Sequence, residues 1–77
     1  MTMRKIWIIE LLKGHTKTLK VFTTEIPLPN KGDILSFDFL DVSGEYEVQY
    51  NRLVFEEDNF VHVEIYVKEM KIEKIGD

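Results

Sequence analysis

Apolar and polar residues alternate along most of this chain, and a period of two residues is typical of β-strands. The alternation is cleanest at Leu35, Phe37 and Phe39, which face away from Ser36 and Asp38. Val, Ile, Thr, Phe and Tyr are abundant and alanine is absent, so helix signals are weak and β-propensity is high. The pattern therefore predicts an all-β protein.

Turn residues divide this pattern into five predicted strands. They cover residues 4–12, 17–24, 35–39, 45–55 and 60–68. Pro27 and Pro29 lack backbone donors, so we expect an extended connection that crosses one end of the fold. Residues 69–77 alternate only in part, and strand, helical turn and disorder all remain open for them.

The first predicted strand is apolar on both faces, with Ile6 and Ile8 on one side and Trp7, Ile9 and Leu11 on the other. Such a strand is central in a barrel, bulged, or covered on both sides. A monomer of this size has little material to cover two faces, so the strand also favours a homodimer.

The alternation of apolar and polar residues changes phase within the fourth predicted strand. Tyr46, Val48 and Tyr50 share one face, whereas Leu53 and Phe55 have the opposite parity, which predicts a bulge or bend at residues 51–52. In the last strand we expect Val61, Val63, Ile65 and Val67 to point inward and Phe60, His62, Glu64 and Tyr66 to lie on the other face.

Five or six short strands without a linker predict a single domain over residues 1–77. We expect a small antiparallel five- to six-stranded barrel of the SH3-like type, closed or nearly closed because closure removes exposed strand edges. An OB-type barrel fits less well, since residues 41–44 leave no room for its helix. The nine aromatic residues should fill the interior and leave no cavity for chemistry.

Composition points to a cytoplasmic protein that crosses no membrane. The chain has no cysteine, and no apolar run approaches the ~20 residues of a membrane-spanning helix. Glu10 and Lys13 interrupt the apolar start, which is therefore not read as a signal peptide.

Charge is distributed unevenly about the net value of −4 and suggests two binding alternatives. Residues 1–31 carry six Lys or Arg and two Glu, whereas residues 32–67 carry one Arg and nine Asp or Glu. The basic first hairpin is a candidate for single-stranded nucleic acid, with Trp7 or Phe22 stacking on a base. The acidic half is a candidate for a basic partner, as a nucleic-acid mimic. The possible nucleic-acid contacts are Lys13, His15, Lys17 and Lys20, and the possible acidic face is Glu45, Glu47, Glu56, Glu57 and Asp58.

We predict no catalytic, cofactor or metal site, and we expect the protein not to be an enzyme. His15 and His62 are the only histidines and are expected to be solvated. Glu45 and Glu47 are about 6.5–7 Å apart along a strand, a spacing that suits two-carboxylate hydrolysis. Gln49 is expected on the same face of the strand, however, and its presence there indicates an ordinary solvent-exposed face.

Residues 28–35, Leu-Pro-Asn-Lys-Gly-Asp-Ile-Leu, contain a Pro-x-x-Gly-Asp step into a strand. Tyr46-Glu47-Val48 and residues 61–65 then supply a central and a closing strand. Over residues 28–67 the chain thus resembles small bacterial and phage β-barrel proteins of the SH3-like type. The resemblance implies a small β-barrel and supplies no catalytic residue.

The leading hypothesis for function is a non-enzymatic interaction module. It would act on a protein partner, or on a second copy, through a sheet face or an exposed edge. Nucleic-acid binding and acidic mimicry remain the alternatives.

Overall fold

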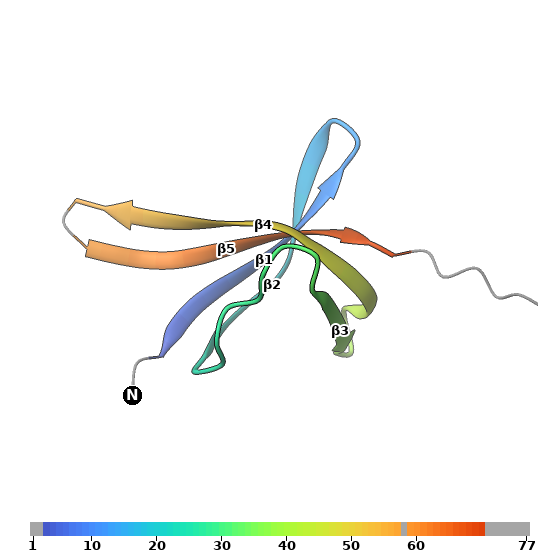
Figure 1. Cartoon of the computed structure of the whole chain (residues 1–77), viewed down its shortest axis with the longest axis horizontal. Helices are drawn as coiled ribbons and strands as arrows, with labels where there is room; N and C mark the ends of the chain where they lie inside the picture. Colours follow the sequence, from blue (N-terminus) through green and yellow to red (C-terminus); the bar gives the residue numbers. More distant parts are fainter. Residues whose placement is uncertain (1–2, 58, 71–77) are drawn as a thin grey trace, which may run out of the picture.

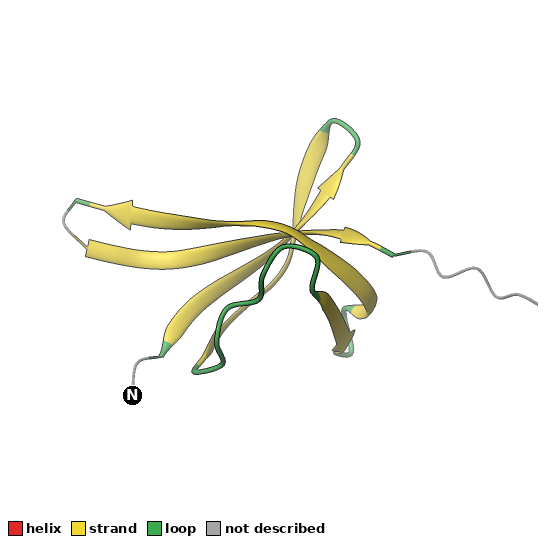
Figure 2. Cartoon of the chain, in the orientation of Figure 1, coloured by secondary structure: helices red, strands yellow, loops and turns green. Residues whose placement is uncertain are grey.

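The computed structural model describes residues 3–57 and 59–70, and gives no side-chain description for residues 59–61. Five strands and no helix form in the described ranges (Figures 1 and 2), which confirms the all-β prediction. The strands are β1 (Arg4–Leu12), β2 (His15–Thr24), β3 (Ile34–Asp38), β4 (Ser43–Glu56) and β5 (Asn59–Glu69).

All five strands belong to one sheet in the order β2-β1-β5-β4-β3. Neighbours are antiparallel except β1 and β5, which run parallel from Ile6 opposite Val63 to Glu10 opposite Val67. The prediction of a wholly antiparallel sheet is therefore wrong at this pair. No hairpin joins β1 to β5, so no tight turn forces them into opposite directions.

The sheet curls strongly but does not close into a barrel (Figure 1). Its two edge strands are β2 and β3, whose Cα atoms stay more than 8 Å apart. Paired strands lie about 4.8 Å apart, so a gap separates these edges. We call this gap the seam. Where a closed or nearly closed barrel was expected, the structure thus shows a strongly curled half-barrel. The strand β3 is short, and the proline-containing connection before it does not pair with β2.

The concave face of the half-barrel holds the core. Its fully buried members come from all strands except the two edges, and they are Ile6, Ile8, Tyr46, Val48, Val63, Ile65 and Val67. The inward direction predicted for the described part of the last strand is therefore confirmed. Leu35 and Phe37 pack against this core, whereas Phe39 lies beyond the end of β3 and is 38% exposed.

The connection between β2 and β3 crosses one end of the half-barrel, as predicted. Arg4 Nη1 donates a hydrogen bond to the Ile26 carbonyl at 3.3 Å, and Asn51 Nδ2 donates to the Pro29 carbonyl at 2.8 Å. Leu28 packs against the core between these two anchors. The connection is therefore fixed to β1 at one side and to β4 at the other.

The phase change in β4 lies two residues earlier than predicted. The register shifts between Val48 and Tyr50, so Gln49 is the extra residue. Tyr50 consequently pairs with Tyr66 on the convex face rather than sharing the concave face with Tyr46. Leu53 returns to the concave side, opposite Val63.

Tight turns connect the first two and the last two strands. Gly14 has a φ of +80°, a conformation that glycine adopts without strain, and lets β2 begin at His15 instead of residue 17. β5 ends at Glu69, and the remainder of the predicted tail, residues 71–77, lies outside the described residues.

Candidate functional site: the seam between the edge strands

A cavity of about 510 Å³ opens at the seam. The prediction of a filled interior is therefore wrong. The cavity lies between the end of β2, the connection that crosses the barrel end, and the start of β3. Its apolar lining residues are Ile6, Ile8, Phe22, Ile26, Pro27, Leu28, Pro29, Ile34, Leu35, Phe37 and Ile65.

The two polar residues of the lining already have partners. Thr24 Oγ1 accepts a hydrogen bond from the Ile26 N–H at 3.1 Å, and Asp33 Oδ2 accepts one from the Asn30 N–H at 2.7 Å. An unpaired charge in such an environment is costly. The cavity is therefore suited to apolar groups.

Two strand edges form the walls of the seam. β2 pairs only with β1 and β3 pairs only with β4, and among the described residues no backbone hydrogen bond joins β2 to β3. An edge strand presents a row of N–H and C=O groups to which another strand can pair. Val21 and Ile34 are 41% and 46% exposed on the two edges, so the walls of the seam are partly apolar as well.

Side chains bridge one half of the seam. Lys20 Nζ lies 3.1 Å from Asp41 Oδ1 and 4.8 Å from the centre of the Phe39 ring. The ring of Phe22 on β2 meets the same Phe39 ring at 6.4 Å between centres. The hydrogen bond from Lys20 lowers the pKa of Asp41. The other half of the seam opens on the cavity.

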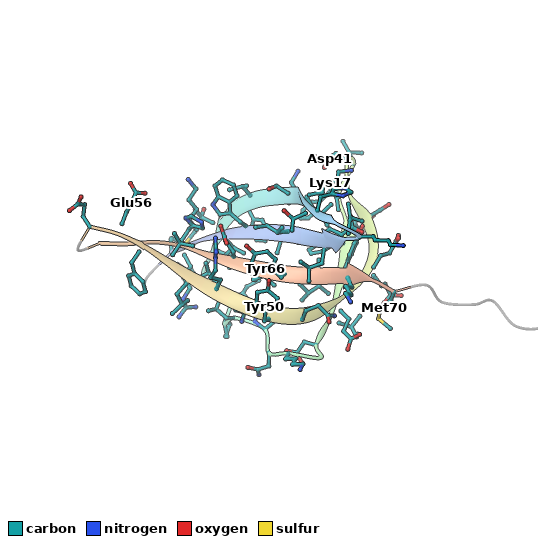
Figure 3. The ribbon with its side chains drawn as sticks, turned by 90° about the horizontal axis from the view of Figure 1, so that it is seen from above. Lys17, Asp41, Tyr50, Glu56, Tyr66 and Met70 are labelled. Atoms are coloured by element: carbon teal, nitrogen blue, oxygen red, sulfur yellow. The ribbon has the colours of Figure 1, made fainter. Side chains whose placement is uncertain are left out.

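A second hollow, of about 450 Å³, lies at the opposite end of the half-barrel and is polar. Glu10, Lys17, Asp41 and Tyr46 are among its lining residues, and Figure 3 shows Lys17 and Asp41 at the same end of the molecule. Burial raises the pKa of the Tyr46 hydroxyl, and the charges of Glu10 and Glu69 raise it further. Carboxylates and ammonium groups are mixed here, so the hollow selects neither sign of charge.

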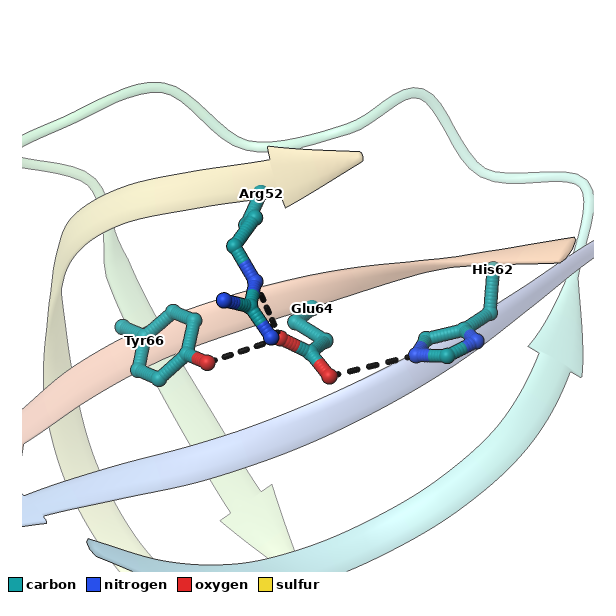
Figure 4. A network of polar contacts seen from close by, with 4 residues as sticks. All are labelled: Arg52, His62, Glu64 and Tyr66. Atoms are coloured by element: carbon teal, nitrogen blue, oxygen red, sulfur yellow. Dashed lines mark hydrogen bonds and ion pairs between the residues drawn. The ribbon is translucent and has the colours of Figure 1, made fainter. Parts of the chain in front are cut away.

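The convex face carries a polar network centred on Glu64, which is only 9% exposed (Figure 4). Its carboxylate accepts hydrogen bonds from Tyr66 at 2.7 Å, Arg52 Nε at 2.8 Å and His62 Nε2 at 3.2 Å. Burial of the carboxylate raises its pKa, but these three hydrogen bonds outweigh burial and leave the pKa of Glu64 below its ordinary value. Burial, followed by the bond to Glu64, raises the pKa of Tyr66.

Aromatic rings cover this network. Trp7 stacks on His62 with ring centres 5.0 Å apart, and Tyr50 stacks on Tyr66 at 4.6 Å (Figure 3). The side chain of His62 is 13% exposed, so the expectation of a solvated histidine is wrong. Ile9 is 7% exposed beside these residues, and β1 is thus covered on both faces within one chain.

The structure only partly assembles the predicted nucleic-acid contacts. Lys13, His15, Lys17 and Lys20 all belong to the β1–β2 hairpin. Lys20 is paired with Asp41, Lys17 stands opposite Glu10 across the hairpin, and His15 Nδ1 is bonded to the Lys13 carbonyl. Two of the three lysines thus have carboxylates as neighbours.

The predicted acidic face is divided between two ends of β4. Glu45 and Glu47 lie near the start of β4. Glu56 is the last residue of β4 (Figure 3), and Glu57 follows it in the turn of the β4–β5 hairpin. The nine residue steps from Glu47 to Glu56 span about 30 Å in a strand. Asp58 lies outside the described residues. These acids do not form one surface.

Within residues 3–57 and 59–70, no three His, Asp or Glu side chains are placed to hold a metal ion. The same ranges contain no helix with the length and apolar character needed to cross a bilayer. Searches of protein-family models, of curated proteins and of solved structures found no match to this chain.

Proposed function

We propose that this protein is a non-enzymatic interaction module that binds an extended segment of a partner protein by strand addition in the seam. The observation that carries the proposal is the position of β2 and β3, whose edges flank one gap above an apolar cavity. Strand addition is a common mode of peptide recognition, in which the main chain supplies affinity and alternate side chains supply specificity.

We expect the seam to admit one additional strand. A strand placed between two others needs about 9.6 Å between them, twice the spacing of paired strands. No Cα atoms of β2 and β3 lie within 8 Å of one another, so the two edges stand further apart than paired strands do. The inserted backbone would then pair with both edges.

The cavity indicates the side chains of the bound segment. In an extended segment every second side chain points the same way, so residues at positions i and i+2 would enter the cavity. The lining residues Ile6, Leu28 and Phe37 favour aliphatic or aromatic groups there. The partner segment is therefore expected to alternate apolar with polar residues.

The proposal can be tested with a synthetic eight-residue peptide of alternating Val and Thr, flanked by lysines. An isomer with all its valines contiguous serves as the control peptide. We expect millimolar or tighter binding of the alternating peptide, with slower amide hydrogen exchange in β2 and β3. Absence of binding at millimolar concentration, or equal binding of both peptides, overturns the proposal.

A pair of protein variants locates the binding site. Val21→Lys places a charge on the seam edge of β2, and edge charges oppose strand addition. Leu12→Lys places the same charge on an exposed apolar residue at the end of β1, away from the seam. We expect at least a tenfold loss of peptide affinity for Val21→Lys and no change for Leu12→Lys.

A further inference from the structure

The polar hollow of about 450 Å³ contains a buried tyrosine whose hydroxyl has no partner. Tyr46 lines the hollow and is only 6% exposed, yet its hydroxyl makes no hydrogen bond within the described part of the chain. Burial, followed by the charge of Glu10, raises the pKa of this hydroxyl, and Glu10 lines the same hollow. An unpaired polar group in a buried side chain is costly, and a ligand in the hollow can supply the missing acceptor.

Two opposite charges also border the hollow without pairing. Glu10 on β1 and Lys17 on β2 stand directly opposite each other in the register, and both line the hollow. No ion pair joins their side chains, and neither has another charged partner among the described residues. Asp41, in contrast, is held by Lys20 Nζ at 3.1 and 3.4 Å from its two carboxylate oxygens. The described lining therefore leaves one carboxylate and one ammonium group available to a ligand.

One side of the hollow is apolar. Leu19 and Val42 are half-buried lining residues. Leu19 is the extra residue where the β1–β2 register shifts, and it packs against the concave core. Val42 is fixed by its carbonyl, which accepts a hydrogen bond from the Phe39 N–H at 2.8 Å. An aliphatic group of a ligand can contact these two side chains.

From this arrangement we infer that the hollow binds a free α-amino acid with an aliphatic side chain, held at both of its charges. Glu10 accepts hydrogen bonds from the ammonium group of the ligand, while Lys17 and the Tyr46 hydroxyl donate to its carboxylate. Cα atoms of directly opposite residues in an antiparallel pair are about 4.5–5.5 Å apart, so the two charged side chains can reach one compact zwitterion. A ligand with a single charge leaves Glu10 or Lys17 unpaired. Because the ligand is small, we expect a dissociation constant of about 1 mM.

Titration of the full chain with L-leucine at pH 6, followed by amide chemical shifts in NMR, tests the inference. L-leucinamide carries only the ammonium group and N-acetyl-L-leucine only the carboxylate, so these two compounds are the matched controls. We expect leucine to shift the amides of residues 10, 17 and 46 and to bind at least tenfold more tightly than either control. Absence of binding at tens of millimolar leucine, or equal binding of leucine and one control, overturns the inference.

Charge-neutralising variants assign the two ionic contacts. Glu10→Gln should weaken leucine binding at least tenfold but should not weaken N-acetyl-leucine, which has no ammonium group. Lys17→Gln should weaken leucine binding by a similar factor but should not weaken leucinamide, which has no carboxylate. An unchanged affinity for leucine in either variant contradicts the inference.

A pair of tyrosine variants tests the hydroxyl. Tyr46→Phe keeps the buried ring and should lower the affinity for leucine about fivefold. Tyr50→Phe removes a hydroxyl from the convex face, where Tyr50 is 49% exposed, and should have no effect. Equal affinities of these two variants for leucine overturn the assignment of the hydroxyl to the site.

The amino-acid site and the proposed peptide site are tested separately. Val21→Lys, which blocks the seam, should abolish peptide binding and leave leucine binding unchanged. Tyr46→Phe should have the opposite pattern. Loss of leucine binding in Val21→Lys would place leucine at the seam and overturn the inference.

Discussion

The two faces of the sheet are both buried at its central strands β1 and β5, but by different means. On the concave face, aliphatic residues such as Ile8, Val48 and Val67 pack together without directional contacts. On the convex face, Glu64 is enclosed by three hydrogen-bond donors under stacked rings. Hydrophobic burial is non-directional, whereas a buried carboxylate requires each of its partners.

This difference explains why only the concave face has an opening. The concave face is open at the seam and keeps a cavity of about 510 Å³. The convex network has every Glu64 oxygen bonded. A face held by apolar packing can therefore remain open to a partner, while the buried Glu64 carboxylate has all its partners within the chain.

The largest expected effect is a concave cavity mutation. Ile8 is 2% exposed, and Ile8→Ala should lower the free energy of unfolding by about 3–4 kcal/mol through lost burial and a new void. Urea denaturation followed by Trp7 fluorescence measures the change. Leu40→Ala is the control and should leave the unfolding midpoint where it is. A loss below about 1 kcal/mol for Ile8→Ala would contradict the concave core.

Removal of the convex carboxylate should cost somewhat less. Glu64→Ala leaves the buried Tyr66 hydroxyl without its acceptor, and the expected loss is about 1–3 kcal/mol. Glu47→Ala removes an exposed glutamate from the neighbouring strand and serves as control. Equal unfolding midpoints for the two variants would show that the network contributes nothing specific.

The pH dependence of stability separates the two faces further. The folded-state pKa of Glu64 lies below its ordinary value of 4.5, so its ionised form stabilises the folded state. That contribution is complete above the ordinary value and is lost as pH falls through the lower folded-state pKa. Thermal unfolding from pH 7 to pH 3 should therefore show a steeper acid decline in the wild type than in Glu64→Gln. Ile8→Val, which changes only the concave face, should keep the wild-type slope.

The smallest effect on stability is expected at the bridged half of the seam. Lys20→Ala removes the contacts with Asp41 and Phe39, all of them partly or fully exposed, so the unfolding midpoint should hardly move. The same substitution should raise the affinity of the alternating peptide, because an inserted strand no longer competes with the bridge. Unchanged affinity would indicate that the bridge and the peptide do not share the seam.

The sequence predicted the elements of this fold better than their pairing. Alternation located five strands and the direction of Val63, Ile65 and Val67, because a side-chain period of two is a local property. It carried no information on strand direction, so the parallel pairing of β1 with β5 was missed. It also placed the bulge at residues 51–52 instead of Gln49, since Tyr50 is compatible with either face.

The alternation of apolar and polar residues also could not predict the seam or the Glu64 network, because both depend on how the strands are ordered in the sheet. Glu64 lies between Val63 and Ile65 in an otherwise apolar strand, and that position is the one signal that it is enclosed. Its donors come from β4 and β5 and the covering Trp7 from β1, which only the sheet order brings together. The seam depends on closure, a property of the whole sheet that no single strand encodes.

The sheet order has a consequence for how the chain is made. β5 is the last strand to be synthesised, yet it lies at the centre of the sheet between β1 and β4. Until residues 59–69 leave the ribosome, the β1–β2 and β3–β4 hairpins have no strand in common, and isolated hairpins are marginally stable. The sheet therefore cannot be completed before β5 is available, because only β5 joins the two hairpins.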